Sequence, residues 1–101
     1  MNEALISTIT FCKRLKKLVL GFDAVKESIQ KGQTQLVLTA SDSSAKTQKE
    51  INYLCSQCCV LCCQTPFTLD EYWYLVGKRV GVIAVEDEGF AKKIIAHLKQ
   101  E

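Results

Sequence analysis

The chain has 101 residues and a mass of 11.3 kDa, with 48% hydrophobic and 24% charged residues. This length and composition suit one globular domain over residues 1–101 and exclude disordered, fibrous and multidomain proteins. The formal net charge of +2 permits a nucleic-acid partner but does not require one.

The N-terminal region does not read as a membrane span or a secretory signal. No apolar stretch reaches the roughly 20 residues that a membrane-spanning helix needs. Glu3 precedes the first apolar stretch and a basic cluster follows it, which reverses the polarity of a signal peptide. We therefore expect a cytoplasmic protein with no membrane partner, whose six cysteines are free thiols.

The first third of the chain alternates helical and strand patterns. Apolar residues recur at helical spacing over residues 4–15, which predicts a helix that ends in the basic cluster 13–17. The short apolar run 18–20 predicts a strand. A second helical repeat over residues 22–29 predicts a helix that stops at Gly32.

The middle of the chain continues the alternation. The β-rich run 36–40 predicts a central strand. Thr47 and Glu50 have the spacing of a capping box, and an apolar stripe from there to Cys58 predicts a third helix. The uncharged run 60–63 predicts a buried strand.

The last third carries the clearest boundary signals. After the break at Pro66, residues 68–71 read as a capping box that begins a fourth helix, and Gly77 ends it. The apolar run 80–85 predicts a strand. Three acids at the start of residues 86–98 suit the positive end of a last helix.

The predicted order is α-β-α-β-α-β-α-β-α, with strands that are apolar on both faces. Such strands are buried on both sides, so helices must cover the sheet above and below. The sequence therefore predicts the α/β class, as a three-layer α/β/α sandwich around a central four-stranded sheet.

No residue pattern indicates an enzyme, a metal site or a cofactor site. The cysteine block 55–63 holds two adjoining C-x-x-C pairs, but they lack the spacer that paired zinc ligands need, which favours small core residues. His97 suits a solvated helix position, and the apolar stripe around Trp73 favours a core residue over an exposed stacking surface. The glycines never approach a phosphate-loop spacing.

A run of cations precedes the turn at Gly21, where the second helix begins with unbonded backbone N–H groups. Cations beside a helix N-terminus form a candidate anion site. Ordinary surface lysines at a solvated helix end would look the same, so these residues alone leave the partner open.

Several segments resemble the ribosomal L-seven-Ae/L-thirty-e family of kink-turn RNA-binding proteins, above all its bacterial YlxQ-like branch. The resemblance covers nearly the whole chain and rests on residues 17–25, 28–29, 31–32, 35–44, Thr47, Cys55 and 82–93. It implies the same α/β/α sandwich and no catalytic activity. It also implies that the partner is RNA, either a kink-turn or a ribosomal RNA.

In that family, RNA is held at the turn into the second helix by a Gly-x-Asn-Glu-x-x-Lys motif. Gly21 matches the glycine, whereas Asp23, Ala24 and Glu27 replace the three polar positions, with Lys26 adjacent to the last. Asp23 can accept hydrogen bonds but not donate them, and Glu27 repels phosphates.

The resemblance also implies basic contacts outside the motif. Lys13, Arg14 and Lys17 match basic residues of the first helix and the segment after it, and the loop 77–80 matches a second RNA-facing element. The candidate RNA-binding residues are therefore Lys13, Arg14, Lys17, Gly21, Phe22, Asp23, Lys26, Lys78, Arg79 and Val80.

Two other functions remain open from the sequence. A module that kept the fold but lost its RNA contacts would interact with proteins through an aromatic surface around Tyr72 and Tyr74. A thiol or metal protein would use the cysteine block instead. The leading hypothesis is a non-catalytic protein that recognises structured or ribosome-associated RNA.

Overall fold

A computed structural model describes residues 3–99, and its elements alternate as the sequence predicts. The helices are α1 (Glu3–Arg14), α2 (Phe22–Gln30), α3 (Ala45–Gln57), α4 (Leu69–Val76) and α5 (Glu88–Lys99). The strands are β1 (Leu18–Leu20), β2 (Leu36–Thr39), β3 (Leu61–Gln64) and β4 (Val82–Val85). Within the described range, every helix is too short or too polar to cross a membrane.

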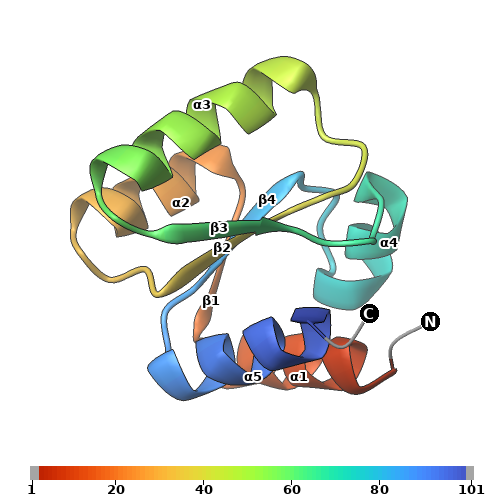
Figure 1. Cartoon of the computed structure of the whole chain (residues 1–101). Coiled ribbons are helices and arrows are strands. Elements are labelled where there is room, and N and C mark those ends of the chain that lie inside the picture. The colour runs from red at the N-terminus through yellow and green to blue at the C-terminus, as the bar shows by residue number, and fades with distance from the viewer. Residues whose placement is uncertain (1–2, 100–101) are drawn as a thin grey trace.

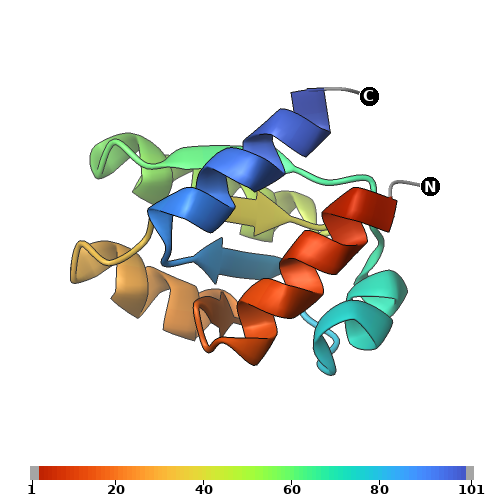
Figure 2. The same ribbon diagram turned by 90° about the horizontal axis from the view of Figure 1, so that it is seen from below.

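The four strands form one mixed sheet in the order β1-β4-β2-β3. Strand β4 runs antiparallel to both β1 and β2, and β2 runs parallel to β3. Helices α2 and α3 cover one face of the sheet, and α1 and α5 cover the other (Figure 1). Figure 2 shows α1 and α5 side by side beneath the sheet, with α4 beyond one end of it. The predicted three-layer α/β/α sandwich is confirmed.

Each inner strand contributes side chains to two hydrophobic cores, one on each face of the sheet, because successive side chains of a strand point to opposite faces. Leu36 and Leu38 of β2 lie in the core beneath α1, α4 and α5, whereas Val37 lies in the core beneath α2 and α3. Strand β4 divides in the same way, with Ile83 on the first side and Val82 on the second. This double burial explains why the inner strands are apolar throughout.

Local capping fixes where α4 begins and ends. The Thr68 hydroxyl accepts a hydrogen bond from the Glu71 amide at 3.2 Å, and the Glu71 carboxylate accepts one from the Thr68 amide at 2.9 Å. Gly77 ends the helix in a left-handed conformation with φ 77°. The capping box predicted at Thr47 is wrong: α3 is capped by Ser44, whose hydroxyl accepts from the Thr47 amide at 3.1 Å.

Two predictions about the cysteine-rich segment are also wrong. Strand β3 is only partly buried because it lies at the edge of the sheet, and Leu61 is 51% exposed. Cys55 is buried, but Cys58 and Cys59 are exposed because α3 has ended and the chain turns at Cys59, with φ 56°. Among residues 3–99, no three His, Cys, Asp or Glu side chains come together as metal ligands.

Candidate functional site

A shallow depression of about 280 Å³ lies where several loops meet at one end of the sheet. Its walls come from the β1–α2 turn, the β2–α3 loop with the start of α3, the beginning of α4 and the α4–β4 loop with the start of β4. The lining residues are Gly21, Phe22, Ser43, Ser44, Thr47, Leu69, Val80, Gly81 and Val82. Three of the predicted RNA-binding residues, Gly21, Phe22 and Val80, are therefore brought together here.

Gly21 determines the backbone conformation at the N-terminus of helix α2. Its φ of 94° and ψ of 154° lie in a region that is essentially restricted to glycine. As the N-cap residue it offers no side chain, so none caps the N–H groups of the first turn. The first intrahelical bond runs from the Val25 amide to the Gly21 carbonyl at 2.9 Å. The amides of residues 22–24 thus have no acceptor inside the helix and can donate to an external one.

Backbone hydrogen bonds hold the neighbouring loops in fixed positions. The Gly21 amide donates to the Val82 carbonyl at 3.0 Å, and the Ala40 amide donates to the Gly81 carbonyl at 2.9 Å. A Cβ at Gly81 would lie 3.3 Å from both Leu69 Cδ2 and Ser43 Cβ, so any side chain at this position would crowd the neighbouring loop and helix, which a glycine avoids. The depression is therefore a pre-organised part of the fold.

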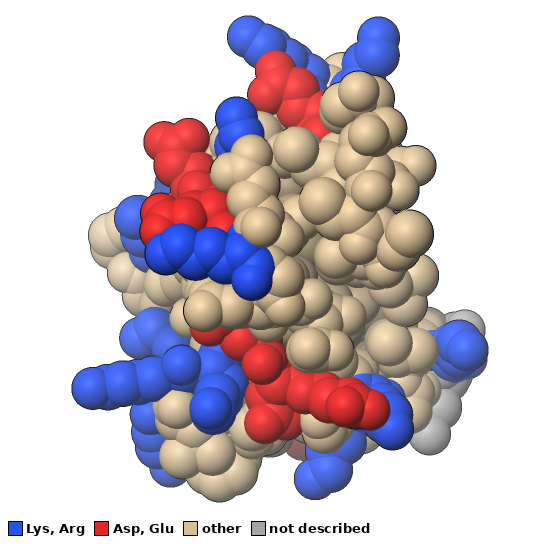
Figure 3. All heavy atoms as spheres, turned by 90° about the vertical axis from the view of Figure 1, so that its left-hand side faces the viewer, with Lys and Arg blue, Asp and Glu red and all other residues tan. Residues whose placement is uncertain are grey.

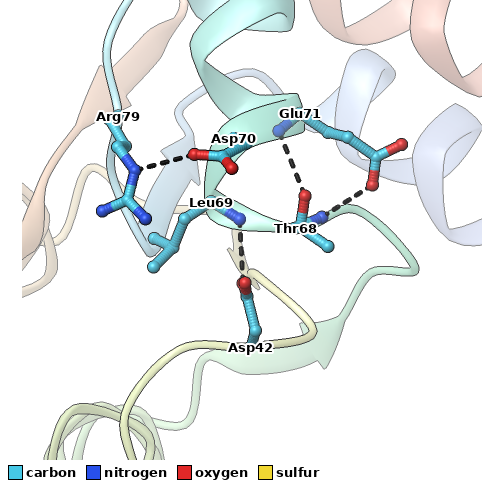
Figure 4. Close-up of polar contacts among 6 residues, drawn as sticks. All are labelled: Asp42, Thr68, Leu69, Asp70, Glu71 and Arg79. Atoms are coloured by element: carbon cyan, nitrogen blue, oxygen red, sulfur yellow. Dashed lines mark hydrogen bonds and ion pairs between the residues drawn. The ribbon is translucent and has the colours of Figure 1, made fainter.

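Helix α4 is anchored to the same end of the sheet (Figure 4). Asp42, in the β2–α3 loop, accepts a hydrogen bond from the Leu69 amide at 2.8 Å. In the α4–β4 loop, the Arg79 guanidinium donates a hydrogen bond to the carboxylate of Asp70, in the first turn of α4, at 2.9 Å. The Arg79 and Asp70 side chains are 57% and 80% exposed, so this ion pair contributes little stability and can rearrange when a ligand binds.

Other cations flank the depression. The Lys13 ammonium lies 3.8 Å from where a Cβ on Gly77 would stand, which brings α1 to the α4–β4 loop that carries the exposed Lys78. Lys26, on α2, lines a second hollow between α2 and α3 with Phe22. Asp23 is exposed in the first turn of α2.

Glu27, which takes the place of the family's lysine, is engaged by a cation of its own helix. Its carboxylate lies 2.7 Å from the Lys31 ammonium, one turn further on. The hydrogen bond from Lys31 lowers the pKa of Glu27, so this carboxylate is charged at neutral pH. The pair removes part of the repulsion that the sequence alone suggests between Glu27 and an anionic ligand.

Two of the predicted cations lie away from the depression. The Lys17 carbonyl accepts from the Glu86 amide at 2.8 Å, at the end of β1 opposite to Gly21. Arg14 stands over the ring of Phe11, 6.0 Å from its centroid, in a hollow that Phe90 and Lys93 also line. Figure 3 views the end of the molecule where α2 finishes and α5 begins, and acidic and basic side chains are interspersed on that face.

The structure adds residues that the sequence analysis did not select. Ser43, Ser44 and Leu69 line the depression, and the run of small polar residues after the central strand was the available signal. The core assignment of Trp73 is wrong, because this side chain is 55% exposed. Tyr72 is instead fully buried, so of the two tyrosines proposed for an aromatic surface only Tyr74 is exposed.

Comparisons with known proteins agree with this architecture. The model of the Ribosomal protein L7Ae/L30e/S12e/Gadd45 family matches residues 3–95. The chain is 33% identical over 90 residues to the RNA-binding protein YlxQ of Bacillus subtilis, covering 84% of this chain and 85% of that protein. It is 30% identical over 97 residues to the RNA-binding protein YlxQ of Enterococcus faecium, covering 92% and 93%.

Solved structures give the same result. A Bacillus halodurans protein of unknown function superposes with a TM-score of 0.90 at 25% identity, covering 98% of this chain and 99% of that one. The Giardia lamblia 15.5kD RNA binding protein superposes with a TM-score of 0.76 at 12% identity, covering 96% and 83%, which shows a shared fold. The expected absence of catalysis agrees with relatives that are RNA-binding proteins. The chain belongs to the Ribosomal protein L7Ae/L30e/S12e/Gadd45 family, where its relatives include the bacterial YlxQ proteins.

Proposed function

We propose that this protein binds structured RNA at the depression beside Gly21. The observation that carries the proposal is the glycine-specific backbone of Gly21, which presents the uncapped first turn of α2 to a preformed hollow. The RNA-binding relatives support the same class of ligand. The proposed contacts are Lys13, Gly21, Phe22, Asp23, Lys26, Lys78, Arg79 and Val80, with Arg14 and Lys17 outside the central surface.

The groups around the depression suit RNA chemically. The free amides of residues 22–24 donate to base or phosphate oxygens, because the positive end of the helix dipole favours such acceptors. The Asp23 carboxylate accepts hydrogen bonds from base amino groups. Lys13 and Lys78 supply the sequence-independent attraction to phosphates that dominates affinity and makes it depend on salt.

The kink-turn is the specific RNA element that we propose, either within ribosomal RNA or in another structured RNA. In this proposal, the backbone at Gly21 recognises the shape of the RNA kink-turn and its sheared G·A pairs. The family's motif side chains do not, because Asp23, Ala24 and Glu27 replace them. Backbone donors retain this geometry whatever the neighbouring side chains are, so recognition by shape survives their replacement.

The decisive experiment compares a standard kink-turn RNA with the same RNA after its G·A pairs are disrupted. Binding of the purified full chain is measured by gel shift and calorimetry at two salt concentrations. We expect preference for the intact kink-turn at both. Equal, salt-sensitive binding to both RNAs would contradict kink-turn recognition and leave a general RNA surface. Binding to neither RNA would contradict RNA binding and favour the protein-interaction module.

Changing Asp70 to Asn should tighten RNA binding several-fold. The substitution removes a negative charge beside the site and releases the Arg79 guanidinium, 2.9 Å away, for a phosphate. One added phosphate contact steepens the slope of log affinity against log salt by about 0.7 to 0.9. Filter binding over a salt series measures both effects, while the free energy of unfolding should change by less than about 1 kcal/mol.

The matched control is Glu88 to Gln. This substitution breaks an equally exposed acid–lysine pair, Glu88 with Lys92 at 3.2 Å, at the start of α5 and away from the depression. It removes the same charge and should leave the salt slope unchanged. Equal gains in affinity from both variants would mean that only net charge matters and that Arg79 makes no specific contact.

A further inference from the structure

Trp73 is a large aromatic side chain that the fold does not need for its core. It is 55% exposed and makes no ring contact with another aromatic residue of the described chain. The buried face of α4 is supplied instead by Tyr72 and Val76, which are 0% and 2% exposed. An exposed indole on a helix that already has a complete apolar face is available for a ligand.

Helical geometry gives the direction of this side chain. Residues four apart lie on the same side of a helix, so Trp73 is one turn beyond Leu69, which lines the depression. Asp70, three residues before Trp73, pairs with Arg79 of the α4–β4 loop. Trp73 therefore stands on the flank of α4 that borders the proposed RNA site.

The neighbouring tyrosine faces another way. Tyr74 is 86% exposed and lines a separate hollow with Ile6 and Thr10 of α1 and with Leu75. The two exposed aromatic residues of α4 therefore do not form one continuous patch. This separation argues against a broad protein-docking surface and leaves Trp73 as an isolated platform.

The charges around Trp73 indicate which kind of ligand would bind against its exposed ring. Cations lie at the C-terminal end of α4: Lys13 reaches Gly77, and Lys78 and Arg79 follow that glycine. An aromatic face beside a positively charged rim suits a nucleotide, because the base stacks on the ring while cations hold the phosphate. Arg79 already pairs with Asp70, but no ion pair of the described residues involves Lys13 or Lys78, and a purely apolar peptide would offer these two cations no anionic partner.

We propose that Trp73 is a stacking platform for an unpaired nucleobase of the RNA whose structured part binds beside Gly21. The inference rests on the proposed function and extends that site along α4, from the depression to the α4–β4 loop. Stacking is tolerant of base identity because every base has an aromatic face. Trp73 therefore adds affinity for RNAs with an unstacked nucleotide rather than sequence specificity.

The chain contains a single tryptophan, so its fluorescence reports on this position alone. Titration with kink-turn RNA should quench the emission as a base stacks on the indole. Trp73 to Leu should weaken binding on the order of 10-fold, because leucine keeps an apolar side chain but has no stacking face, whereas Trp73 to Phe should retain most of the affinity. Tyr74 to Leu is the matched control and should bind like the unchanged protein.

The two proposals fail differently. Suppose that a gel shift shows RNA binding, but the tryptophan emission is not quenched and Trp73 to Leu binds RNA with normal affinity. This result would overturn the stacking platform and leave RNA binding intact. If the kink-turn RNA does not bind, titration with oligoadenylate tests Trp73 separately. Quenching of the indole emission in the unchanged protein, together with weaker oligoadenylate binding by Trp73 to Leu in a gel shift, would support the platform, and an unchanged spectrum would overturn it as well.

Discussion

Replacing Gly21 with alanine is expected to lower the stability of the protein and its affinity for RNA together. The glycine has φ 94° and ψ 154°, a conformation that strains any side-chain-bearing residue by about 1–3 kcal/mol. An added Cβ would meet only Val80 Cγ1, at an ordinary 3.8 Å, so the effect comes from the backbone rather than from a clash. Urea unfolding measures the loss, and thermal unfolding should shift downward by several degrees.

The same change tests the proposed site. Relief of the strain rotates the backbone at the N-cap and turns the amides of residues 22–24 away from the depression, so RNA affinity should fall while circular dichroism still shows a folded protein. Gly32 to Ala is the control: Gly32 also has a positive φ, 72°, with open space around it, but it lies at the other end of α2. If Gly21 to Ala bound RNA as tightly as the unchanged protein, the RNA interface would have to lie elsewhere on the molecule.

Local signals were sufficient for most of the fold. The capping box at Thr68 and Glu71 and the left-handed Gly77 act within one helix, so the sequence alone predicts where α4 begins and ends. The apolar inner strands require cover on both faces, and that requirement yields the three layers. These predictions depend on near neighbours in the chain, which is why they could be made without the tertiary structure.

The errors arise where the order of strands or the surface of a helix matters. Periodicity does not reveal that β3 is an edge strand, so its uncharged run suggested burial that only β2 and β4 achieve. Trp73 lies beside the apolar stripe of α4, but Tyr72 and Val76 already fill the space beneath that helix. A hydrophobic pattern shows which side chains prefer burial, and packing decides which of them are buried.

The candidate site was predictable only in part. The glycine turn before α2 and the basic loop after Gly77 are visible in the sequence and meet at the depression. Ser43 and Gly81 are contributed by loops that are distant in the sequence, and the pairing of β2 with β4 brings them so close that a Cβ on Gly81 would lie 3.3 Å from Ser43 Cβ. Conversely, Lys17 is only four residues from Gly21 but lies at the opposite end of β1, because an extended strand separates its ends.

Truncating Tyr72 to alanine should remove about 3–5 kcal/mol of stability, the range for deleting a buried aromatic side chain. Its ring is fully buried and lies 6.3 Å from the ring of Phe67, centroid to centroid. A domain of this size has only about 5–15 kcal/mol of stability in total, so this variant should unfold at low urea concentration or at ambient temperature. Phe11 to Ala is the control, because that ring is 48% exposed and should contribute less.

Tyr72 to Phe isolates the hydroxyl group and should cost about 1 kcal/mol at neutral pH. The Tyr72 hydroxyl lies 2.7 Å from the Thr65 hydroxyl, whose own proton goes to the Thr39 carbonyl, so Tyr72 is the donor. Burial raises the pKa of Tyr72 above its ordinary value. The tyrosine therefore ionises more readily in the unfolded chain, and its stabilising contribution is present below about pH 10 and lost as the pH rises further. Urea unfolding at neutral and alkaline pH should show the stability difference between the two proteins narrowing at high pH, whereas a constant difference would mean that the phenol is solvated in the folded protein.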